Sequence, residues 1–127
     1  MKKTKMLKKN YEFRNVLSKG KYYSGKNIEV FIKKNNLKEI NFLGIAIGVK
    51  IAKATKRNRI KRLIRENYRL IEEKLSLGYS IVFLWKKNVN IENATFYNIK
   101  NDINIIFDKA NIFIEYKRIW KKYLFGL

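Results

Sequence analysis

The pattern of hydrophobic and polar residues along the chain predicts three β-strands. Residues 27–33 alternate, with apolar side chains on one side and mostly polar ones on the other, which is typical of a half-buried strand. Residues 42–49 and 79–85 are almost continuously apolar, which indicates strands buried near the centre of a sheet. The polar run at 33–38 predicts a turn and indicates a hairpin between the first two strands.

Apolar residues recur at helical spacing near both ends of the patterned region. Residues 10–20 carry a short apolar stripe, with Asn10 as the expected N-cap and Gly20 as the stop. Residues 95–109 predict another helix, whose buried stripe consists of Phe96, Ile99, Ile103, Ile106 and Phe107.

A longer helix is expected between the two apolar strands. It begins near Thr55, a candidate cap, and continues to about Leu77, because Gly78 follows. Strand, helix and strand in this order form a crossover unit, so the strands at 42–49 and 79–85 are expected to be parallel.

This helix has two chemically different faces. Its apolar face contains a single polar residue, Asn67, and consists of Ile60, Leu63, Ile64, Asn67, Tyr68, Ile71 and Leu75. The opposite face forms a stripe roughly 16 Å long, made of Asn58, Arg62, Arg65 and Arg69. Glu66 lies within one turn of Arg62 and Arg69 and could orient both.

The arginines of the chain are concentrated in this helix. Five of the seven fall between residues 57 and 69, namely Arg57, Arg59, Arg62, Arg65 and Arg69. Guanidinium groups bind phosphates bidentately, which lysine does less well. The stripe is therefore suited to an RNA or DNA backbone. The alternative is a solvated charged face on a helix that only packs against the core.

A last helix is expected near the C-terminus, where aromatic residues alternate with basic ones. Its apolar positions are Phe113, Tyr116, Ile119, Trp120, Tyr123 and Leu124. Packing on the core is one interpretation. Base stacking on a basic element and binding at a membrane surface are the alternatives. No linker or repeat divides the chain, so the 127 residues predict one domain.

Charge and composition narrow the function. Thirty basic and ten acidic residues give a net charge of +20, which attracts polyanions, most simply nucleic acid. The absence of Cys and His excludes disulfides, thiolate nucleophiles, an imidazole base and the usual zinc sites. The carboxylates form no clustered acidic motif, so the chain is not expected to catalyse a reaction alone. The basic start lacks an apolar signal segment, and we expect a cytoplasmic protein.

The segment from 57 to 66 resembles the bacterial ribonuclease P protein subunit. The hallmark R-N-x-x-K-R-x-x-R-E/Q of that family is unbroken here, as Arg57, Asn58, Lys61, Arg62, Arg65 and Glu66. Supporting matches are Leu7 to Asn10, Phe13, Val16 and Gly20 in the first helix, and Lys50, Ile51 and Ala54 before the second. The resemblance covers about residues 5–110. Val49 and Ala52 depart from the family's loop, and Glu29 replaces an apolar residue on the sheet.

The resemblance implies an α/β (α+β) domain over residues 1–110. Nothing carries over to residues 111–127, a basic, aromatic extension that we expect to be helical and packed on the same domain. For the domain, the resemblance implies a four-stranded sheet with three helices, in the order α-β-β-β-α-β-α, with a left-handed crossover. It also implies that a separate catalytic RNA, using Mg²⁺, removes the 5′ leader of precursor tRNA. The protein would bind both RNAs as a monomer in a 1:1 ribonucleoprotein, without membrane association and without a metal site of its own.

The resemblance further implies two RNA-binding surfaces. The first would bind catalytic RNA and substrate through Lys50, Arg57, Asn58, Arg59, Lys61, Arg62, Arg65 and Arg69. Asn58 could contact a base, a phosphate or a metal-bound water, or could cap the helix. The second is a leader-binding cleft between the first helix and the sheet, with Phe13 and Phe31. Both aromatic residues could instead belong to the core, and Glu29 would repel a leader phosphate.

Two other classes of nucleic-acid-binding protein fit the same charge. A ribosomal-protein-like binder would recognise structured RNA without affecting cleavage. A DNA-binding protein is less consistent with the sequence, because the arginine-rich helix is flanked by strands and not by a second helix of a helix-turn-helix.

Overall fold

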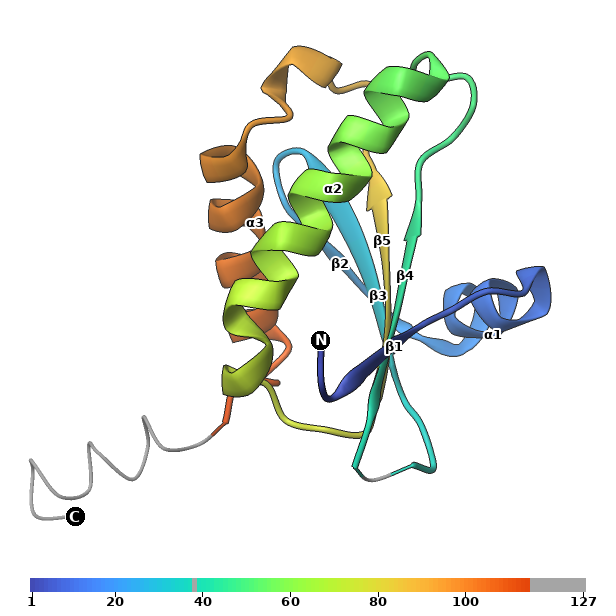
Figure 1. Cartoon of the computed structure of the whole chain (residues 1–127), viewed down its shortest axis with the longest axis vertical. Coiled ribbons are helices and arrows are strands. Elements are labelled where there is room, and N and C mark those ends of the chain that lie inside the picture. The colour runs from blue at the N-terminus through green and yellow to red at the C-terminus, as the bar shows by residue number, and fades with distance from the viewer. Residues whose placement is uncertain (38, 115–127) are drawn as a thin grey trace, which may run out of the picture.

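A computed structural model describes residues 1–37 and 39–114 as one mixed α+β unit (Figure 1). The strands and α-helices are β1 (Thr4–Met6), α1 (Asn10–Lys19), β2 (Lys21–Ser24), β3 (Ile28–Lys34), β4 (Asn41–Ala46), α2 (Ala54–Ile71), β5 (Tyr79–Trp85) and α3 (Phe96–Lys109). Two short 3₁₀ turns, η1 (Glu72–Lys74) and η2 (Ile91–Asn93), follow α2 and β5.

The strands form one five-stranded sheet in the order β1-β4-β5-β3-β2. β4 and β5 are parallel, which confirms the predicted crossover through α2. The predicted hairpin at residues 33–38 is wrong, because β5 lies between β3 and β4 and pairs with both. β5 is apolar at every position but one and is buried along most of its length, as a central strand requires.

The sheet has five strands where four were expected, because β1 adds a parallel edge strand beside β4. β1 has only three residues, and β2 is a four-residue edge strand that is mostly exposed. Neither is long enough or buried enough to produce an alternating pattern. β1 is held by Thr4, which is buried and whose hydroxyl lies 2.8 Å from the Tyr68 hydroxyl of α2.

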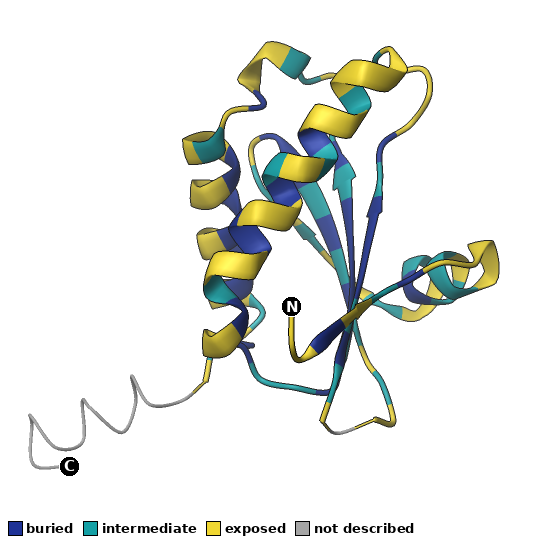
Figure 2. Ribbon diagram, in the orientation of Figure 1, coloured by how far each residue is buried: buried dark blue, intermediate teal, exposed yellow. Residues whose placement is uncertain are grey.

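α2 and α3 pack side by side on one face of the sheet, and α1 lies on the other (Figures 1 and 2). The apolar stripes predicted for both longer helices face the core. In α2 the fully buried side chains are Ile60, Ile64 and Tyr68, and in α3 they are Ile99, Ile103, Ile106 and Phe107. They meet alternate residues of the central strands, including Val30, Leu43, Ile81 and Phe83.

Buried polar side chains tie the elements together. The Asn67 amide donates to the carbonyls of Leu63 at 3.0 Å and Phe96 at 3.3 Å, so the one polar residue of the buried stripe joins α2 to the start of α3. The Asp102 carboxylate on α3 accepts from the backbone N–H of Asn27 at 2.8 Å, just before β3. Each pair satisfies groups that would be costly to bury alone.

The helix ends differ from the sequence-based expectation. α1 is preceded by Lys9 and not capped by Asn10, and the Glu12 carboxylate accepts from the Lys9 N–H at 2.9 Å. Thr55 is not the cap of α2, which begins one residue earlier. α2 ends at Ile71 and not near Leu77 as predicted, because the chain continues into the tighter 3₁₀ turn η1. Gly78, which has a φ of 95°, lies after this turn.

The chain after α3 returns to the core. Ile112 is buried, and the Phe113 ring lies 6.1 Å from the ring of Phe107. The N–H of Ser76 donates to the Ile112 carbonyl at 2.6 Å, which joins this segment to the loop before β5. The predicted C-terminal helix falls almost wholly on residues 115–127, which lie outside the described residues.

Truncation of the α2 core residue Ile64 to alanine is expected to lower the free energy of unfolding by about 2–5 kcal/mol, because the side chain is fully buried. Leu70→Ala on the same helix is the matched control, since Leu70 is 55% exposed. Urea denaturation followed by circular dichroism would measure both. Equal effects of the two substitutions would contradict the assigned faces of α2.

Asp102→Ala is expected to cost about 1–3 kcal/mol, because the buried N–H before β3 loses its partner. Asp108→Ala removes an exposed carboxylate from the same helix and should change the stability by less than about 0.5 kcal/mol. Thermal denaturation of both variants would compare them. An unchanged midpoint for Asp102→Ala would show that this capping bond does not stabilise the turn before β3.

Candidate nucleic-acid interface

The outer face of α2 presents the predicted arginine stripe to solvent. Its members Asn58, Arg62, Arg65 and Arg69 are all exposed, and Figure 2 shows exposed positions along the length of the helix. The stripe borders a shallow hollow lined by Arg59, Arg62, Leu63, Arg65, Glu66 and Arg69. Burial of the opposite apolar stripe holds these side chains outward, so the helix displays them on a rigid support.

Glu66 forms an ion pair with Arg69, with Oε1 2.6 Å from Nη2 and Oε2 3.3 Å from Nε. The hydrogen bond from Arg69 lowers the pKa of the Glu66 carboxyl. The sequence suggested that Glu66 would orient Arg62 as well, but within the described part of the chain its side chain pairs only with Arg69. Residues 1–37 and 39–114 contain no other ion pair, so Arg62 and Arg65 have no carboxylate partner among these residues.

Arg57 and Lys61 differ from the rest of the predicted set because both are half-buried. The Arg57 Nη1 donates to the Ala52 carbonyl at 2.7 Å and so holds the loop before α2 against the helix. Lys50 is exposed in that loop. Asn58 lies inside the helix, because α2 begins at Ala54, so the helix-cap interpretation of Asn58 is wrong.

The two aromatic residues of the predicted leader cleft lie on the other face of the sheet. Phe13 and Phe31 are half-buried and pack against one small cluster, whose buried members are Leu7, Val16 and Val82. The structure brings them together with each other but not with the arginine stripe.

α1 approaches the sheet closely through Phe13. A Cβ atom at Gly44 would lie 2.6 Å from Phe13 Cε1, so only glycine at this position of β4 allows the ring to rest on the strand. Beside α1 is a hollow lined by residues including Tyr11, Asn15, Lys33, Phe42 and Ser80. The Lys33 ammonium donates to the Asn15 side-chain oxygen at 2.6 Å across it.

Tyr22 was not predicted to belong to this surface. Its ring centroid lies 5.2 Å from that of Phe31, and its hydroxyl donates to Glu29 Oε2 at 2.6 Å. The residue pattern carries no clear signal for Tyr22, because it lies on the short edge strand β2 and reaches Phe31 only through the pairing of β2 with β3.

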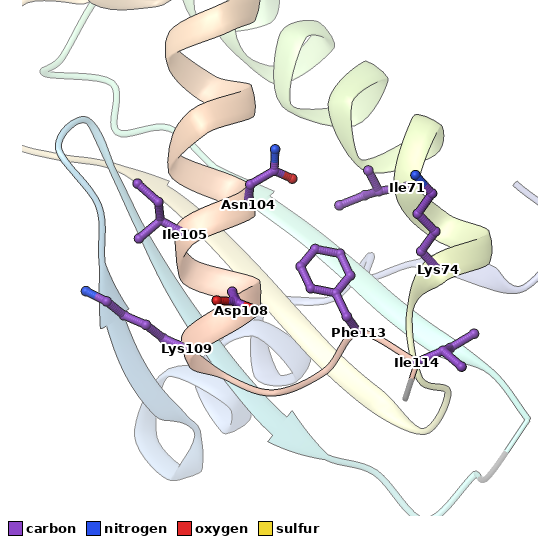
Figure 3. Close-up of a pocket in the computed structure, with 8 residues that line it drawn as sticks. All are labelled: Ile71, Lys74, Asn104, Ile105, Asp108, Lys109, Phe113 and Ile114. Carbon is purple, nitrogen blue, oxygen red and sulfur yellow. The ribbon is translucent and has the colours of Figure 1, made fainter. Parts of the chain in front are cut away.

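Another hollow lies between α3 and the end of α2 (Figure 3). The Phe113 ring lies between the two helices, with Ile71 on one side and Asp108 on the other (Figure 3). This hollow has no arginine in its lining and is separate from the arginine stripe on α2.

The described part of the chain lacks two further features. It contains no group of three or more His, Cys, Asp or Glu side chains placed to hold a metal ion. Within the same residues, every helix is too short or too polar to cross a membrane.

Known proteins resemble this chain over most of its length. The family model named Ribonuclease P matches residues 1–111. The ribonuclease P protein component of Clostridioides difficile is 40% identical over 113 residues, which cover 88% of this chain and 96% of that protein. The component of Fusobacterium nucleatum is 40% identical over 108 residues, covering 84% and 96%.

Solved structures agree. The Staphylococcus aureus RNase P protein superposes with a TM-score of 0.75 at 26% identity, covering 86% of this chain and 97% of that one. The Thermotoga maritima RNase P protein gives a TM-score of 0.71 at 27% identity, covering 80% and 94%. Because the family model, the relatives and the fold coincide over the region that carries the arginine helix, this chain belongs to the family of bacterial ribonuclease P protein components.

Proposed function

We propose that this chain is the protein subunit of a ribonuclease P, in which it binds the catalytic RNA and the 5′ leader of precursor tRNA and promotes 5′ maturation. The observation that carries the proposal is the α2 face, where Arg62 and Arg65 are exposed and have no carboxylate partner in residues 1–37 and 39–114. Family membership supports the same function.

The arginine face would act by charge neutralisation. Two RNAs that meet near a cleavage site repel each other through their phosphates, and guanidinium groups between them reduce this repulsion. The stripe on α2 is long enough to contact several phosphates, and the helix needs no rearrangement to present it. Arg57 would contribute mainly by fixing the loop that carries Lys50.

The reaction itself would be carried out by the RNA subunit, with Mg²⁺ bound there. The chain has no His and no Cys. Several carboxylates already have structural partners: Glu12 and Asp102 accept backbone N–H groups, and Glu66 pairs with Arg69. Asn58 is exposed beside the arginines and is available to a phosphate or to a water on an RNA-bound metal ion.

The leader would lie on the α1 side of the sheet. Phe13 and Phe31 are half-buried, so each offers only part of its ring to a base, while Tyr22 beside Phe31 is 47% exposed. Stacking on such rings contributes about 1–3 kcal/mol per base. Tyr22 therefore joins Phe31 as the main candidate for contact with unpaired nucleotides.

Cleavage of precursor tRNA by a bacterial ribonuclease P RNA at low magnesium, with and without this protein, tests the proposal. We expect mature 5′ ends to accumulate much faster when the protein is present. Tight RNA binding without any effect on cleavage, also with an RNA subunit from a closer source, would favour a ribosomal-protein-like RNA binder instead.

Arg62→Ala and Arg65→Ala are each expected to weaken binding of the catalytic RNA by about 1–2 kcal/mol, because a charged hydrogen bond to phosphate is lost. The dependence of log K on log salt should become shallower by about one phosphate contact. Both side chains are exposed, so the melting temperature should hardly change. Filter binding over a salt series would measure the affinity.

Lys100→Ala is the matched control, because it removes one exposed positive charge from α3 and not from α2. It should leave the affinity nearly unchanged. A lower melting temperature for Arg65→Ala with undiminished RNA binding would show that the α2 face has a structural role only.

A further inference from the structure

Three side chains from β2 and β3 gather on the α1 side of the sheet. Tyr22 lies directly opposite Phe31 in the antiparallel register, and Glu29 is two residues from Phe31 on the same strand. Because side chains alternate along a strand, all three point to one face. The rings of Tyr22 and Phe31 lie 5.2 Å apart at 57°, and Tyr22 donates its hydroxyl hydrogen to Glu29 Oε2 at 2.6 Å.

The group is accessible and fixed in place. Tyr22 is 47% exposed, and Glu29 and Phe31 are half-buried, so a planar ligand can reach both the aromatic surface and the carboxylate. Acceptance by Glu29 raises the pKa of Tyr22, which keeps the phenol protonated as a donor. This bond holds the carboxylate beside the rings.

The Glu29 carboxylate still has capacity to accept. Its Oε1 receives no hydrogen bond from the described residues, and Oε2 has one donor, although a carboxylate offers about four acceptor positions. No lysine or arginine among residues 1–37 and 39–114 forms an ion pair with it, despite the net charge of +20. Glu12, Glu66 and Asp102, by contrast, are used for capping or pairing.

A carboxylate beside aromatic rings can select among bases. Unpaired bases are read through stacking and through hydrogen bonds on the Watson–Crick edge. Guanine presents two adjacent donors there, N1–H and the 2-amino group, which match the two oxygens of a carboxylate. Adenine and cytosine present one donor next to an acceptor, and uracil presents one donor between two acceptors. Each of these three bases therefore sets at least one acceptor against the carboxylate.

We propose that Tyr22, Glu29 and Phe31 form a site for one unpaired guanine in the RNA bound by this face, with the rings stacking on the base and Glu29 accepting from its Watson–Crick edge. The inference rests on the proposed function for the presence of single-stranded RNA at this face. Glu29 repels phosphate, so the base and not the backbone faces β2 and β3. The guanine site would thereby give this chain a preference for one base, which stacking alone does not supply.

The direct test uses the full chain and short fluorescent RNAs of equal length and charge: all-uridine, or uridine with a single guanine, adenine or inosine. Equal charge cancels the electrostatic contribution to the comparison. We expect the guanine RNA to bind about tenfold more tightly than the uridine RNA, as for one bidentate contact. Inosine lacks the 2-amino group and should lose most of this gain.

Glu29→Gln places a donor where one acceptor was and should abolish the guanine preference, with the affinity for uridine RNA retained or raised, because a charge that repels phosphate is removed. Glu92→Gln makes the same charge change at an exposed position after β5 and should keep the preference. Equal binding of guanine, inosine and uridine RNAs by the unmodified chain would overturn the proposal. So would a guanine preference that survives Glu29→Gln, and the RNA series remains decisive if that variant is poorly folded.

Cleavage assays separate this inference from the proposed function. Precursor tRNAs whose leaders carry one guanine at successive positions in a uridine background would be compared by kcat/KM. Stimulation by the protein that is equal for all leaders would leave the subunit role standing and contradict the guanine site. A guanine preference in the short RNAs without stimulation of any precursor would contradict the subunit role instead.

Discussion

The packing of α2 against the sheet is the constraint on which the other features depend. Ile60, Ile64 and Tyr68 are fully buried on one side of this helix, and the geometry of an α-helix then places Arg62, Arg65 and Arg69 on the opposite side. The hydrophobic effect thus determines the direction of the charges. The same helix positions β1 through Tyr68 and the start of α3 through Asn67. One element joins the core to the candidate interface.

The sheet separates two surfaces of different chemistry. α2 carries charge on one side, whereas β2 and β3 display Tyr22, Glu29 and Phe31 on the other. The loop from β4 to α2, which carries the exposed Lys50, is held against the helix by Arg57 through the Ala52 carbonyl. The attraction to phosphate and the discrimination between bases that we propose would therefore belong to different elements.

Most of the acidic residues with a partner in this chain of charge +20 support local structure. Glu12 and Asp102 satisfy backbone N–H groups, and Glu66 restrains Arg69, so these carboxylates serve local geometry. Among residues 1–37 and 39–114, Glu29 is bound only by Tyr22, which makes it different from them. Glu29 departs from the family pattern in the sequence, but its partner Tyr22 is defined only by the pairing of β2 with β3.

The sequence by itself determined the features that depend on neighbours along the chain. The buried and charged faces of α2, the extent of β5, the position of α3 and the exposure of the arginine stripe all follow from local periodicity. Only the tertiary structure decided the strand order, the edge strand β1 and the contact of Tyr22 with Phe31 and Glu29. The physical reason is that a pattern of apolar residues specifies which face of a strand is buried but not which strand lies beside it, because pairing joins residues far apart in sequence.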